Sequence, residues 1–435
     1  CMPVALAELK EVYDKKKVFL VTDSFLDSAG YIKPITDKLH ELGIDYRVFS
    51  HVQPDPTLAN AEEGAEQMRR YQPDCIIAFG GGSAMDAGKI MWVLYEHPDV
   101  TFADMSMRYI DIRKKVYQFP KMGEKALFVA IPTSSGTGSE VTPFAVITDQ
   151  ETGIKYPLAD FNITPDVAIV DPELAETMPK KLVAHTGMDA MTHAIEAYVS
   201  TLHCNYTDPL ALHAIKMIHN NLKKSYDGDM QARAEMHDAQ CLAGMAFSNA
   251  LLGIVHSMAH KTGAAYSGGH IVHGCANAMY LPKVIRFNAV EPEAQKRYAN
   301  IARFLHLEGS TDAELVDALI AHIQNMNKQL DIPTCIKDYE GGIIDEKEFM
   351  EKLPGALKPG GRVAILTFHS GEDKLVKKAL KAGYREGVYS EYAKDVVRPS
   401  AEECAQNGRA RSTKMRWAVK AEHSDCGAGS GICDH

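Results

Sequence analysis

The sequence has no long hydrophobic run. Its longest candidates in 435 residues, Ala126–Pro132 and Leu251–Val255, are far shorter than the ~18 apolar residues that a membrane helix needs. No basic segment followed by an apolar stretch opens the chain, so we expect neither secretion nor a membrane partner. Hydrophobic residues nevertheless make up 46% of the sequence, which is typical of a folded globular protein and too high for a disordered one.

Paired cysteines are also missing. The nine cysteines are scattered from Cys1 to Cys433, and no two of them form a Cys-x-x-Cys motif. An odd number of widely spaced cysteines in a chain of this size is typical of reduced thiols. We therefore expect a cytoplasmic protein without a disulfide framework.

Basic charge is scarce in most of the chain. Residues 1–353 hold 33 lysines and arginines against 47 acidic residues, whereas residues 354–420 hold 14 against 7. An acidic body with a basic end indicates two pieces of different origin or role. The clustered positive charge also predicts weak, nonspecific RNA binding by the C-terminal end, because phosphate binding needs such clusters.

Short apolar runs alternate with helical periodicity in the first part of the chain. Expected strands lie at Lys17–Thr22, Asp45–Ser50, Asp74–Phe79 and Ala126–Ile131. Helical patterns lie between them at 31–42, 58–71 and 83–95. Such alternation predicts a parallel sheet with helices on its faces. We therefore expect an α/β dinucleotide-binding domain over residues 1–171.

The strand signal stops near residue 172. Helical periodicity continues at 181–200, 206–225, 231–260, 290–305 and 312–328, which predicts an all-helical domain over residues 172–353. A third piece follows over 354–420, with turn residues, a buried strand at Arg362–Phe368 and a basic helix at 371–382. Residues 421–435 are rich in Gly, Ser and Asp and are expected to form a disordered tail.

A glycine-rich turn follows the third expected strand. It reads Gly80-Gly81-Gly82-Ser83, and Asp86 lies three residues after Ser83. Glycines at such a point let backbone N–H groups approach a phosphate, whose charge the following helix N-terminus favours. The motif is neither a Walker loop nor Gly-x-Gly-x-x-Gly. A tight strand–helix turn without a ligand therefore remains the alternative.

A second loop, Thr133–Ser139, follows the fourth expected strand and combines glycines with small hydroxyl residues. Two such loops at the carboxyl ends of strands match the ligand sites of doubly wound folds. Asp23 ends the first strand, where its carboxylate would accept a ribose 2′-OH and repel a 2′-phosphate, so we expect NAD rather than NADP. The expected dinucleotide residues are Asp23, Gly80, Gly81, Gly82, Ser83, Asp86, Thr133, Ser134, Thr137, Ser139 and Lys155.

Histidines and one aspartate recur at helical spacing in the second domain. Asp189 and His193 are four residues apart, as are His256 and His260, so each pair shares one helix face. A single buried histidine is usually only a packed side chain. Four of the 18 histidines lie between residues 256 and 273, however, and with the in-phase aspartate they favour a metal site. Imidazole with carboxylate suits Fe²⁺ or Zn²⁺.

These motifs together resemble those of the iron-containing alcohol dehydrogenases. The matching stretches are Gly80–Ser83 with Asp86, Pro132–Glu140, Asp189–Glu196 and His256–His260. The opening, Pro3–Lys10, is similar to the alcohol dehydrogenase half of bifunctional aldehyde–alcohol dehydrogenases. The resemblance covers residues 1–353 and implies a dehydroquinate synthase-like architecture: an α/β domain followed by an all-α metal-binding domain.

The resemblance also implies the metal ligands, which in that family are one Asp and three His. Residue by residue they become Asp189, His193, His256 and His273, the last because the stretch from His273 to Ala278 matches a family motif. The spacing between the third and fourth ligands is longer than in the family, which leaves His270 as a rival. His260 is similar to a non-ligand histidine near the nicotinamide and is expected to be catalytic.

The function implied is a metal-dependent, NAD(H)-linked alcohol dehydrogenase. Such an enzyme interconverts small primary alcohols and aldehydes: the metal lowers the pKa of the alcohol, and a hydride passes to the nicotinamide. The resemblance also implies a homo-oligomer.

Residues 354–420 resemble a different family, the C-terminal end of the ribosomal-RNA cytosine methyltransferases. The matching residues are Leu357–Arg362, Phe368–Ser370 with Glu372 and Asp373, Arg398–Ser400 and Asn407–Ser412. Upstream residues do not supply that family's S-adenosylmethionine-binding half. The alternative function is therefore an inactive fusion product, or an RNA-binding or methyltransferase-related protein that acts through its basic end.

Overall fold

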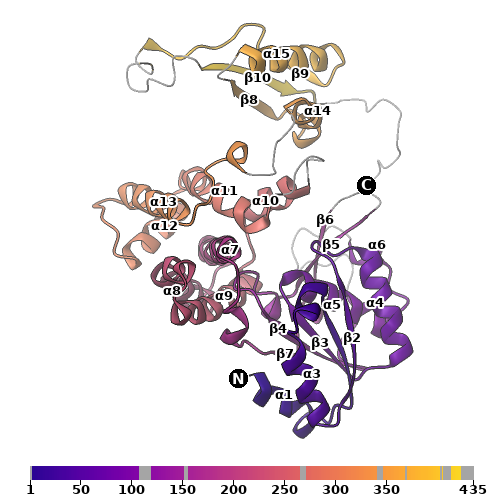
Figure 1. Ribbon diagram of the computed structural model, residues 1–435. Coiled ribbons are helices and arrows are strands. Elements are labelled where there is room, and N and C mark those ends of the chain that lie inside the picture. Colours follow the sequence, from indigo (N-terminus) through magenta and orange to yellow (C-terminus); the bar gives the residue numbers. More distant parts are fainter. Residues whose placement is uncertain are drawn as a thin grey trace. The chain divides into compact units, whose positions relative to one another are not determined.

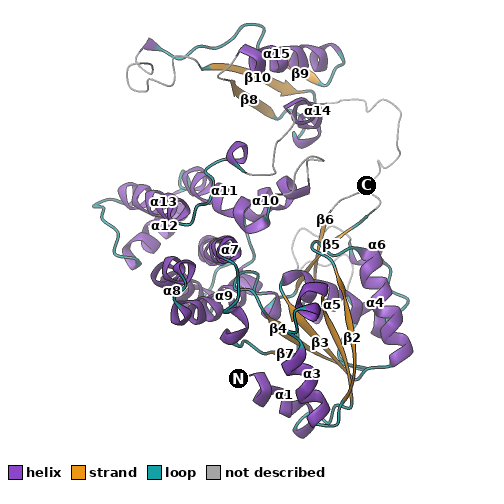
Figure 2. Cartoon of the chain, in the orientation of Figure 1, coloured by secondary structure: helices purple, strands orange, loops and turns teal. Residues whose placement is uncertain are grey.

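The computed structural model describes residues 2–106, 119–150, 155–264, 271–339, 346–367, 370–401, 404 and 413–422. The chain divides into two compact units, one of Cys1–Ala265 with Ile271–Tyr339 and one of Tyr266–His270 with Glu340–His435. Figures 1 and 2 show that the first unit begins with alternating strands and helices and continues with helices alone. The expected tail lies, from residue 423 on, outside the described residues.

A parallel five-stranded sheet forms the centre of the N-terminal part. Its order is β2-β1-β3-β4-β7, and every neighbouring pair is parallel. The strand bounds are β1 (Lys17–Asp23), β2 (Asp45–Val52), β3 (Cys75–Gly80), β4 (Leu127–Pro132) and β7 (Val167–Ala168). The carboxyl ends of the strands therefore meet at one edge, where Gly80 pairs with Pro132. The expected fold class is confirmed.

Helices cover both faces of this sheet because alternate side chains of a strand point to opposite sides. Val18 and Leu20 of β1 pack into one apolar cluster with α1, α2 and α3, whereas Phe19 and Val21 pack into the other with α4 and α5. An antiparallel hairpin of β5 (Phe144–Thr148) and β6 (Lys155–Ala159) follows β4. The helices are α1 (Met2–Glu11), α2 (Ser24–Ser28), α3 (Lys33–Glu41), α4 (Leu58–Tyr71), α5 (Gly82–Glu96) and α6 (Phe102–Met105).

In the rest of the first unit, the helices that the described residues form share one hydrophobic core. They are α7 (Lys180–Val199), α8 (Thr207–Asp227), α9 (Met230–Ala250), α10 (Ile254–Ala264), α11 (His273–Asn288), α12 (Pro292–Phe304) and α13 (Asp312–Gln329). No single helix in the part of the chain that the structure describes is long and apolar enough to cross a membrane. Helix α9 and the start of α10 meet the length and composition criterion only as a pair, which is bent by 101°.

One helix expected from the sequence is in fact two. The periodic segment 231–260 breaks into α9 and α10, because Leu251 adopts a left-handed backbone conformation with φ +63°. Gly253 lies in the same turn, where a β-carbon would stand 2.8 Å from Glu196 Oε1. The break lets α10 begin against the side of α7.

The C-terminal unit has a small core of its own. Its antiparallel sheet has the order β8-β10-β9, and Met350, Leu353, Val376 and Leu380 contribute to one apolar cluster. The elements are α14 (Glu346–Ala356), β8 (Arg362–Thr367), α15 (Ser370–Arg385), β9 (Tyr389–Tyr392) and β10 (Lys414–Lys420).

Two features of this unit differ from the expectation. The strand β8 is not buried, since its side chains alternate between exposed and half-buried until Thr367, as in a sheet with one covered face. The expected boundary after Leu353 falls inside α14, which packs with α15, and the compact units divide between Tyr339 and Glu340.

Candidate active site

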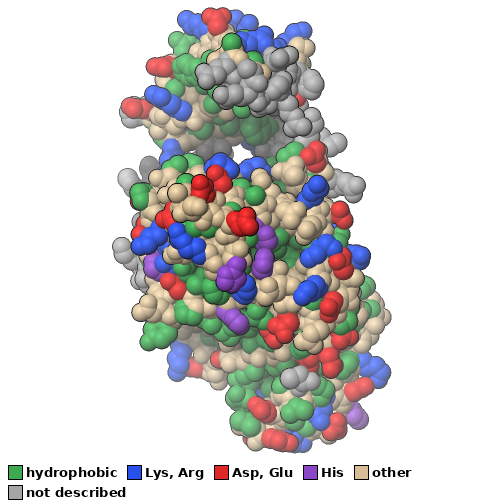
Figure 3. All heavy atoms as spheres, turned by 90° about the vertical axis from the view of Figure 1, so that its left-hand side faces the viewer, with side chains coloured by type: hydrophobic (Ala, Val, Ile, Leu, Met, Phe, Trp, Pro, Cys, Tyr) green, Lys and Arg blue, Asp and Glu red, His purple; other side chains and the backbone are tan. Residues whose placement is uncertain are grey.

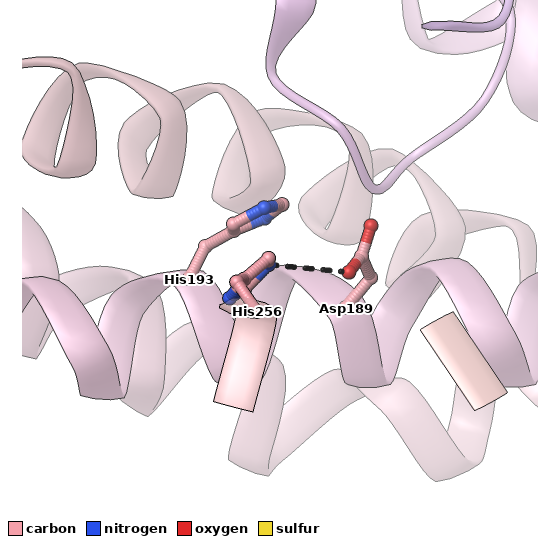
Figure 4. Close-up of side chains that lie close together, drawn as sticks. All are labelled: Asp189, His193 and His256. Atoms are coloured by element: carbon pink, nitrogen blue, oxygen red, sulfur yellow. Dashed lines mark ion pairs between the residues drawn. The ribbon is translucent and has the colours of Figure 1, made fainter. Parts of the chain in front are cut away.

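Helix α7 presents three acidic or imidazole side chains on one face. Asp189, His193 and Glu196 are four and three residues apart, so they point to the same side of the helix. None of the three is more than 7% exposed. Figure 4 shows Asp189 and His193 projecting from this helix toward the side chain of His256. Charged groups buried this deeply need partners.

His256 joins the group from the start of α10. Its Nδ1 lies 2.6 Å from Glu196 Oε2, and its Nε2 lies 3.7 Å from Asp189 Oδ1. Glu196 Oε1 accepts a hydrogen bond of 2.7 Å from the Val255 N–H, which anchors the first turn of α10. A carboxylate that holds one imidazole nitrogen fixes the direction of the other, as is usual for metal-binding histidines.

His273 reaches the same group as the first residue of α11. Its Nε2 lies 3.8 Å from Asp189 Oδ1, and its side chain is 36% exposed, so it lies on the open side of the group. The next residue must be small, because a β-carbon on Gly274 would stand 2.2 Å from the carbonyl oxygen of His185 in α7. The rival ligand His270 lies outside the described residues.

Sequence reasoning missed Asn277, which lies one turn after His273. It is fully buried, and its Nδ2 lies 2.7 Å from Asp189 Oδ1, 3.1 Å from His256 Nε2 and 3.2 Å from His273 Nε2. An amide nitrogen has two hydrogens and cannot serve three acceptors. Asn277 Oδ1 is itself a buried atom without a hydrogen-bond partner among the described residues. The signal available in the sequence was its spacing of four residues from His273.

The charges of the cluster shift pKa values in opposite directions. Burial would raise the pKa of Asp189, but the surrounding histidines outweigh burial and hold that pKa well below its usual range. Burial lowers the pKa of His193 to about 4 and that of His273 well below its ordinary value, although Asp189 opposes both shifts. Burial would also lower the pKa of His256, but the neighbouring carboxylates of Asp189 and Glu196 raise it to about 9. The ionised carboxylate of Asp189 and the neutral imidazoles of His193 and His273 are metal-binding forms, whereas His256 has to lose its proton before it can bind an ion.

The donor set fits a divalent cation. The ligand atoms of Asp189, His193 and His256 all lie within 4.8 Å of one another. Bonds of about 2.0–2.2 Å from one ion put its ligand atoms roughly 3–4 Å apart, and Asp189 Oδ1 lies 3.7 and 3.8 Å from the two imidazole nitrogens nearest to it. Asn277 cannot donate to all three acceptors, so either the proton of His256 or a bound cation has to satisfy the remaining one. Carboxylate with imidazole is a donor set for Fe²⁺ or Zn²⁺.

His260 lies one turn after His256 on α10 and is half-buried. Its ring centroid is 4.6 Å from that of His273 and 6.5 Å from that of His256. It therefore stands at the edge of the cluster, beside the partly exposed His273. Neither His260 nor His273 belongs to the group of mutually close ligand atoms found among the described residues, but His273 Nε2 lies 3.8 Å from Asp189 Oδ1.

The two glycine-containing loops meet at the carboxyl edge of the sheet. Gly80 ends β3 with φ +152°, a conformation that suits glycine. A β-carbon on Gly82 would stand 2.9 Å from Thr137 Cγ2, and one on Gly81 would stand 3.4 Å from Ser134 Oγ. The structure thus brings the glycine turn together with two of the expected hydroxyl residues, at the N-terminus of α5.

Two expected cofactor residues bind each other. Ser139 Oγ donates to Asp86 Oδ1 at 2.8 Å and accepts from Lys89 Nζ at 2.9 Å. Lys89, which sequence reasoning missed, is fully buried and also donates to the carbonyl oxygens of Thr142 and Phe144. Burial lowers the pKa of Lys89 to about 8. These contacts anchor the second loop to α5.

Asp23 lies beside the glycine turn. Its Oδ1 accepts two backbone N–H groups at the start of α2, and its Oδ2 lies 3.9 Å from where a β-carbon on Gly80 would stand. Lys155, by contrast, begins β6 and forms an ion pair of 2.6 Å with Asp55. Of the remaining expected residues, Ser83 lies in the first turn of α5, and Thr133 directly follows β4.

Comparison with known proteins identifies the family. The iron-containing alcohol dehydrogenase model matches residues 3–172, and the C-terminal model of the Fe-containing alcohol dehydrogenase family matches residues 183–357. The NADPH-dependent butanol dehydrogenase of Clostridium saccharobutylicum is 54% identical over 349 residues, which cover 80% of this chain and 86% of that one. The chain belongs to the iron-containing alcohol dehydrogenase family. It is an oxidoreductase, as the resemblance predicted.

Solved iron-containing alcohol dehydrogenases share the fold of the first unit. The enzyme from Thermococcus thioreducens aligns with a TM-score of 0.71 and 32% identity, covering 87% of this chain and 96% of that one. The bifunctional aldehyde-alcohol dehydrogenase of Escherichia coli K12 is 47% identical over 371 residues, which are 81% of this chain and 41% of that one. The chain thus spans less than half the length of that bifunctional relative of the iron-containing alcohol dehydrogenases.

The second resemblance is also confirmed. The MraW methylase family model matches residues 343–421, which belong to the C-terminal unit. The methylase match and the match to the iron-containing alcohol dehydrogenases overlap over residues 343–357, around helix α14.

Proposed function

We propose that this chain interconverts small primary alcohols and aldehydes with a divalent metal, Fe²⁺ or Zn²⁺, and NAD(H). The proposal rests on the convergence of Asp189, His193 and His256 beside the glycine-containing loops. His273 adjoins this group, with its Nε2 3.8 Å from Asp189 Oδ1. The two sites touch, since His193 Nδ1 lies 3.2 Å from the carbonyl oxygen of Gly136 in the second loop. A cluster and a dinucleotide loop in contact are what hydride transfer between a bound alcohol and a nicotinamide requires.

The roles of the residues follow from their contacts. A bound metal would supply the Lewis acidity that lowers the pKa of an alcohol. Glu196 holds His256 at Nδ1 and the Gly136 carbonyl holds His193 at Nδ1, so that the Nε2 lone pairs remain for the ion. His260, half-buried beside the exposed edge of His273, is placed to carry the alcohol's proton to solvent.

For the dinucleotide we propose NAD rather than NADP. The carboxylate of Asp23 lies next to Gly80, at the turn where backbone N–H groups would receive the phosphates. A negative charge there would accept a ribose 2′-OH and repel a 2′-phosphate. The butanol dehydrogenase relative is NADPH-dependent by name, so the cofactor has to be tested on this chain.

The direct test is oxidation of NADH, and separately of NADPH, in the presence of acetaldehyde or butyraldehyde. The full chain should consume NADH with an aldehyde and do so faster than it consumes NADPH. A chain that uses NADPH better would contradict the choice of cofactor. A metal-loaded chain that uses neither would contradict the proposed function.

Asp23→Asn isolates the effect of the charge. Asparagine keeps an acceptor for the N–H groups of α2 but carries no negative charge. One charge repulsion in a partly wet site amounts to about 1–3 kcal/mol, so the preference for NADH over NADPH should narrow by roughly 5- to 150-fold. The control is Asp27→Asn in α2, which should leave the preference for NADH over NADPH unchanged. If Asp23→Asn kept the full preference for NADH over NADPH, other residues would determine the cofactor selectivity.

The methylase match over 343–421 suggests a second candidate function, methyl transfer to RNA. We infer that the C-terminal unit does not carry it out. Its described residues form only three strands and two helices, and the residues before it match dehydrogenases. Incubation of the full chain with labelled S-adenosylmethionine and ribosomal RNA should leave the RNA unlabelled. Label above background would favour methyl transfer, whereas unlabelled RNA retained only at low salt would indicate weak electrostatic binding.

A further inference from the structure

Two histidines on different helices meet outside the candidate active site. His219 lies on α8 and His322 lies on α13, and Nδ1 of the first is 3.0 Å from Nε2 of the second. The ring centroids are 4.8 Å apart, and the ring planes are inclined by 53°. Both residues are half-buried, so the pair keeps access to solvent. On the face that Figure 3 draws, several histidine side chains reach the surface.

Both imidazoles favour the neutral form. Burial lowers the pKa of His219, and the charge of Lys216 lowers it further. Burial also lowers the pKa of His322, with a further contribution from His219. A neutral imidazole has a proton on one nitrogen and a lone pair on the other, and it is the form that binds metals. A change of tautomer in one ring turns both facing nitrogens into lone-pair donors.

The distance between the two nitrogens suits two ligands of one ion. Bonds of about 2.0–2.1 Å from a metal to imidazole nitrogen, at angles of roughly 90–110°, put two such nitrogens about 2.9–3.4 Å apart. The observed 3.0 Å lies within this range. An N–H···N hydrogen bond has a similar length. The distance between the two nitrogens therefore fits a metal as well as a hydrogen bond. Binding requires a change of tautomer and a rotation of the rings that turns both lone pairs toward the ion.

We propose that His219 and His322 form a second metal site, a two-imidazole chelate for a divalent late transition ion such as Ni²⁺, Cu²⁺ or Zn²⁺. Imidazole suits these ions, and water can fill the remaining positions because the rings are half-exposed. The nearby charge of Lys216 opposes a cation, so the site should bind less tightly than the buried cluster around Asp189. The two sites share no residue.

An ion at this site would tie α8 to α13. Because it would bind the folded chain and bridge two helices that separate on unfolding, it would stabilise the native state by mass action. The consequence is measurable without any enzymatic assay, and it is independent of the alcohol dehydrogenase activity proposed above.

The test is a titration of the full chain with Ni²⁺ after loading with one equivalent of Zn²⁺. Equilibrium dialysis should show one further equivalent of Ni²⁺ per chain, and the temperature of unfolding should rise. His219→Ala and His322→Gln should each weaken this binding about 10-fold or more, since even the loss of an outer-shell partner costs about 10-fold. His213→Ala is the matched control, because His213 is exposed on the same helix.

Two precautions keep the outcome clear. His322→Gln retains a hydrogen-bonding side chain, so its loss of Ni²⁺ binding would not reflect a lost hydrogen bond alone. The rise in unfolding temperature caused by Ni²⁺ is compared within each variant, which removes any change in the stability of the metal-free protein. Equal Ni²⁺ binding by wild type and both variants, or no second equivalent in the wild type, would overturn the proposal.

Discussion

The amide nitrogen of Asn277 illustrates how a single residue can set the geometry of the proposed metal site. It lies within hydrogen-bonding distance of one carboxylate oxygen and two imidazole nitrogens. An ion bound by His256 and His273 would take the lone pairs of both imidazole nitrogens, which would leave the amide to Asp189 alone. Asn277 would then act as a positioning residue that holds the carboxylate toward the ion.

Asn277→Ala should therefore weaken metal binding, by about 10- to 100-fold. The measurement is competition for Zn²⁺ with a chelator of known affinity. Asn327→Ala is a matched control, because Asn327 is only 4% exposed and donates a hydrogen bond of 2.7 Å to the Ala278 carbonyl oxygen, away from the ligands. Both variants lose a buried amide, but only Asn277→Ala should change the affinity. Equal affinities in the two variants would contradict the role.

The sequence could predict part of this site for a physical reason. Asp189 and His193 share a helix face at a spacing of four residues whatever the helix packs against. Glu196 and the contact of Asn277 with Asp189 could not be assigned in the same way, because Glu196 binds His256 on α10 and Asn277 reaches Asp189 on α7. Periodicity tells which residues share a face, but it does not tell which faces of different helices meet.

At the scale of elements, the site depends on the close approach of α11 to α7. A β-carbon on Gly274 would stand 2.2 Å from the His185 carbonyl oxygen and 3.2 Å from the β-carbon of Asp189. No side-chain rotation relieves a contact with backbone. The position of His273, the first residue of α11, is therefore set by the absence of a side chain at Gly274.

Gly274→Ala should force the two helices apart. Overpacking of this kind costs about 1–3 kcal/mol or more, so denaturant unfolding should show lower stability, and metal binding should weaken as His273 withdraws. Gly371→Ala in α15 is the control, since nothing lies within 4 Å of a β-carbon there. If Gly274→Ala matched wild type in both measurements, the close approach would not be needed.

The elements themselves were predictable to different degrees. Strands β1 to β4 agree with the expected segments within one or two residues, and of these β1, β3 and β4 are largely apolar, whereas β2 mixes apolar with polar residues. The break between α9 and α10 was not predictable, because it depends on a left-handed Leu251 and on packing against Glu196 rather than on local preference. In the C-terminal unit, β9 and β10 are short or polar and gain their strand character from pairing.

At the scale of the whole molecule, the two units have separate cores and should respond separately to mutation. In the C-terminal unit, Arg416 binds Asp373 through two nitrogens, at 2.8 and 3.3 Å. The hydrogen bond from Arg416 holds the pKa of Asp373 below its usual range. A depressed pKa contributes stability above the unfolded pKa of about 3.9, and this stability is lost as the pH falls through the folded value.

Asp373→Asn should therefore destabilise the C-terminal unit by about 1 kcal/mol at pH 7. The difference from wild type should shrink as the pH falls below about 4. Fluorescence of Trp417, in β10, reports unfolding of this unit, while Trp92, buried in α5, reports the first. The unfolding transition reported by Trp92 should be the same in Asp373→Asn and wild type. A stability difference between the two proteins that does not depend on pH would contradict the ionic role of Asp373. A matching shift of the Trp92 transition would contradict the separation of the units.

The measurement that tests the account most directly is elemental analysis of the purified full chain. The cluster of Asp189, His193, His256 and His273 should hold one iron or zinc ion per chain, and His193→Ala should remove it. His40→Ala, an exposed histidine in α3, should retain the metal. A wild-type chain without stoichiometric metal after loading with Fe²⁺ or Zn²⁺, or a His193→Ala chain that keeps it, would contradict the central claim.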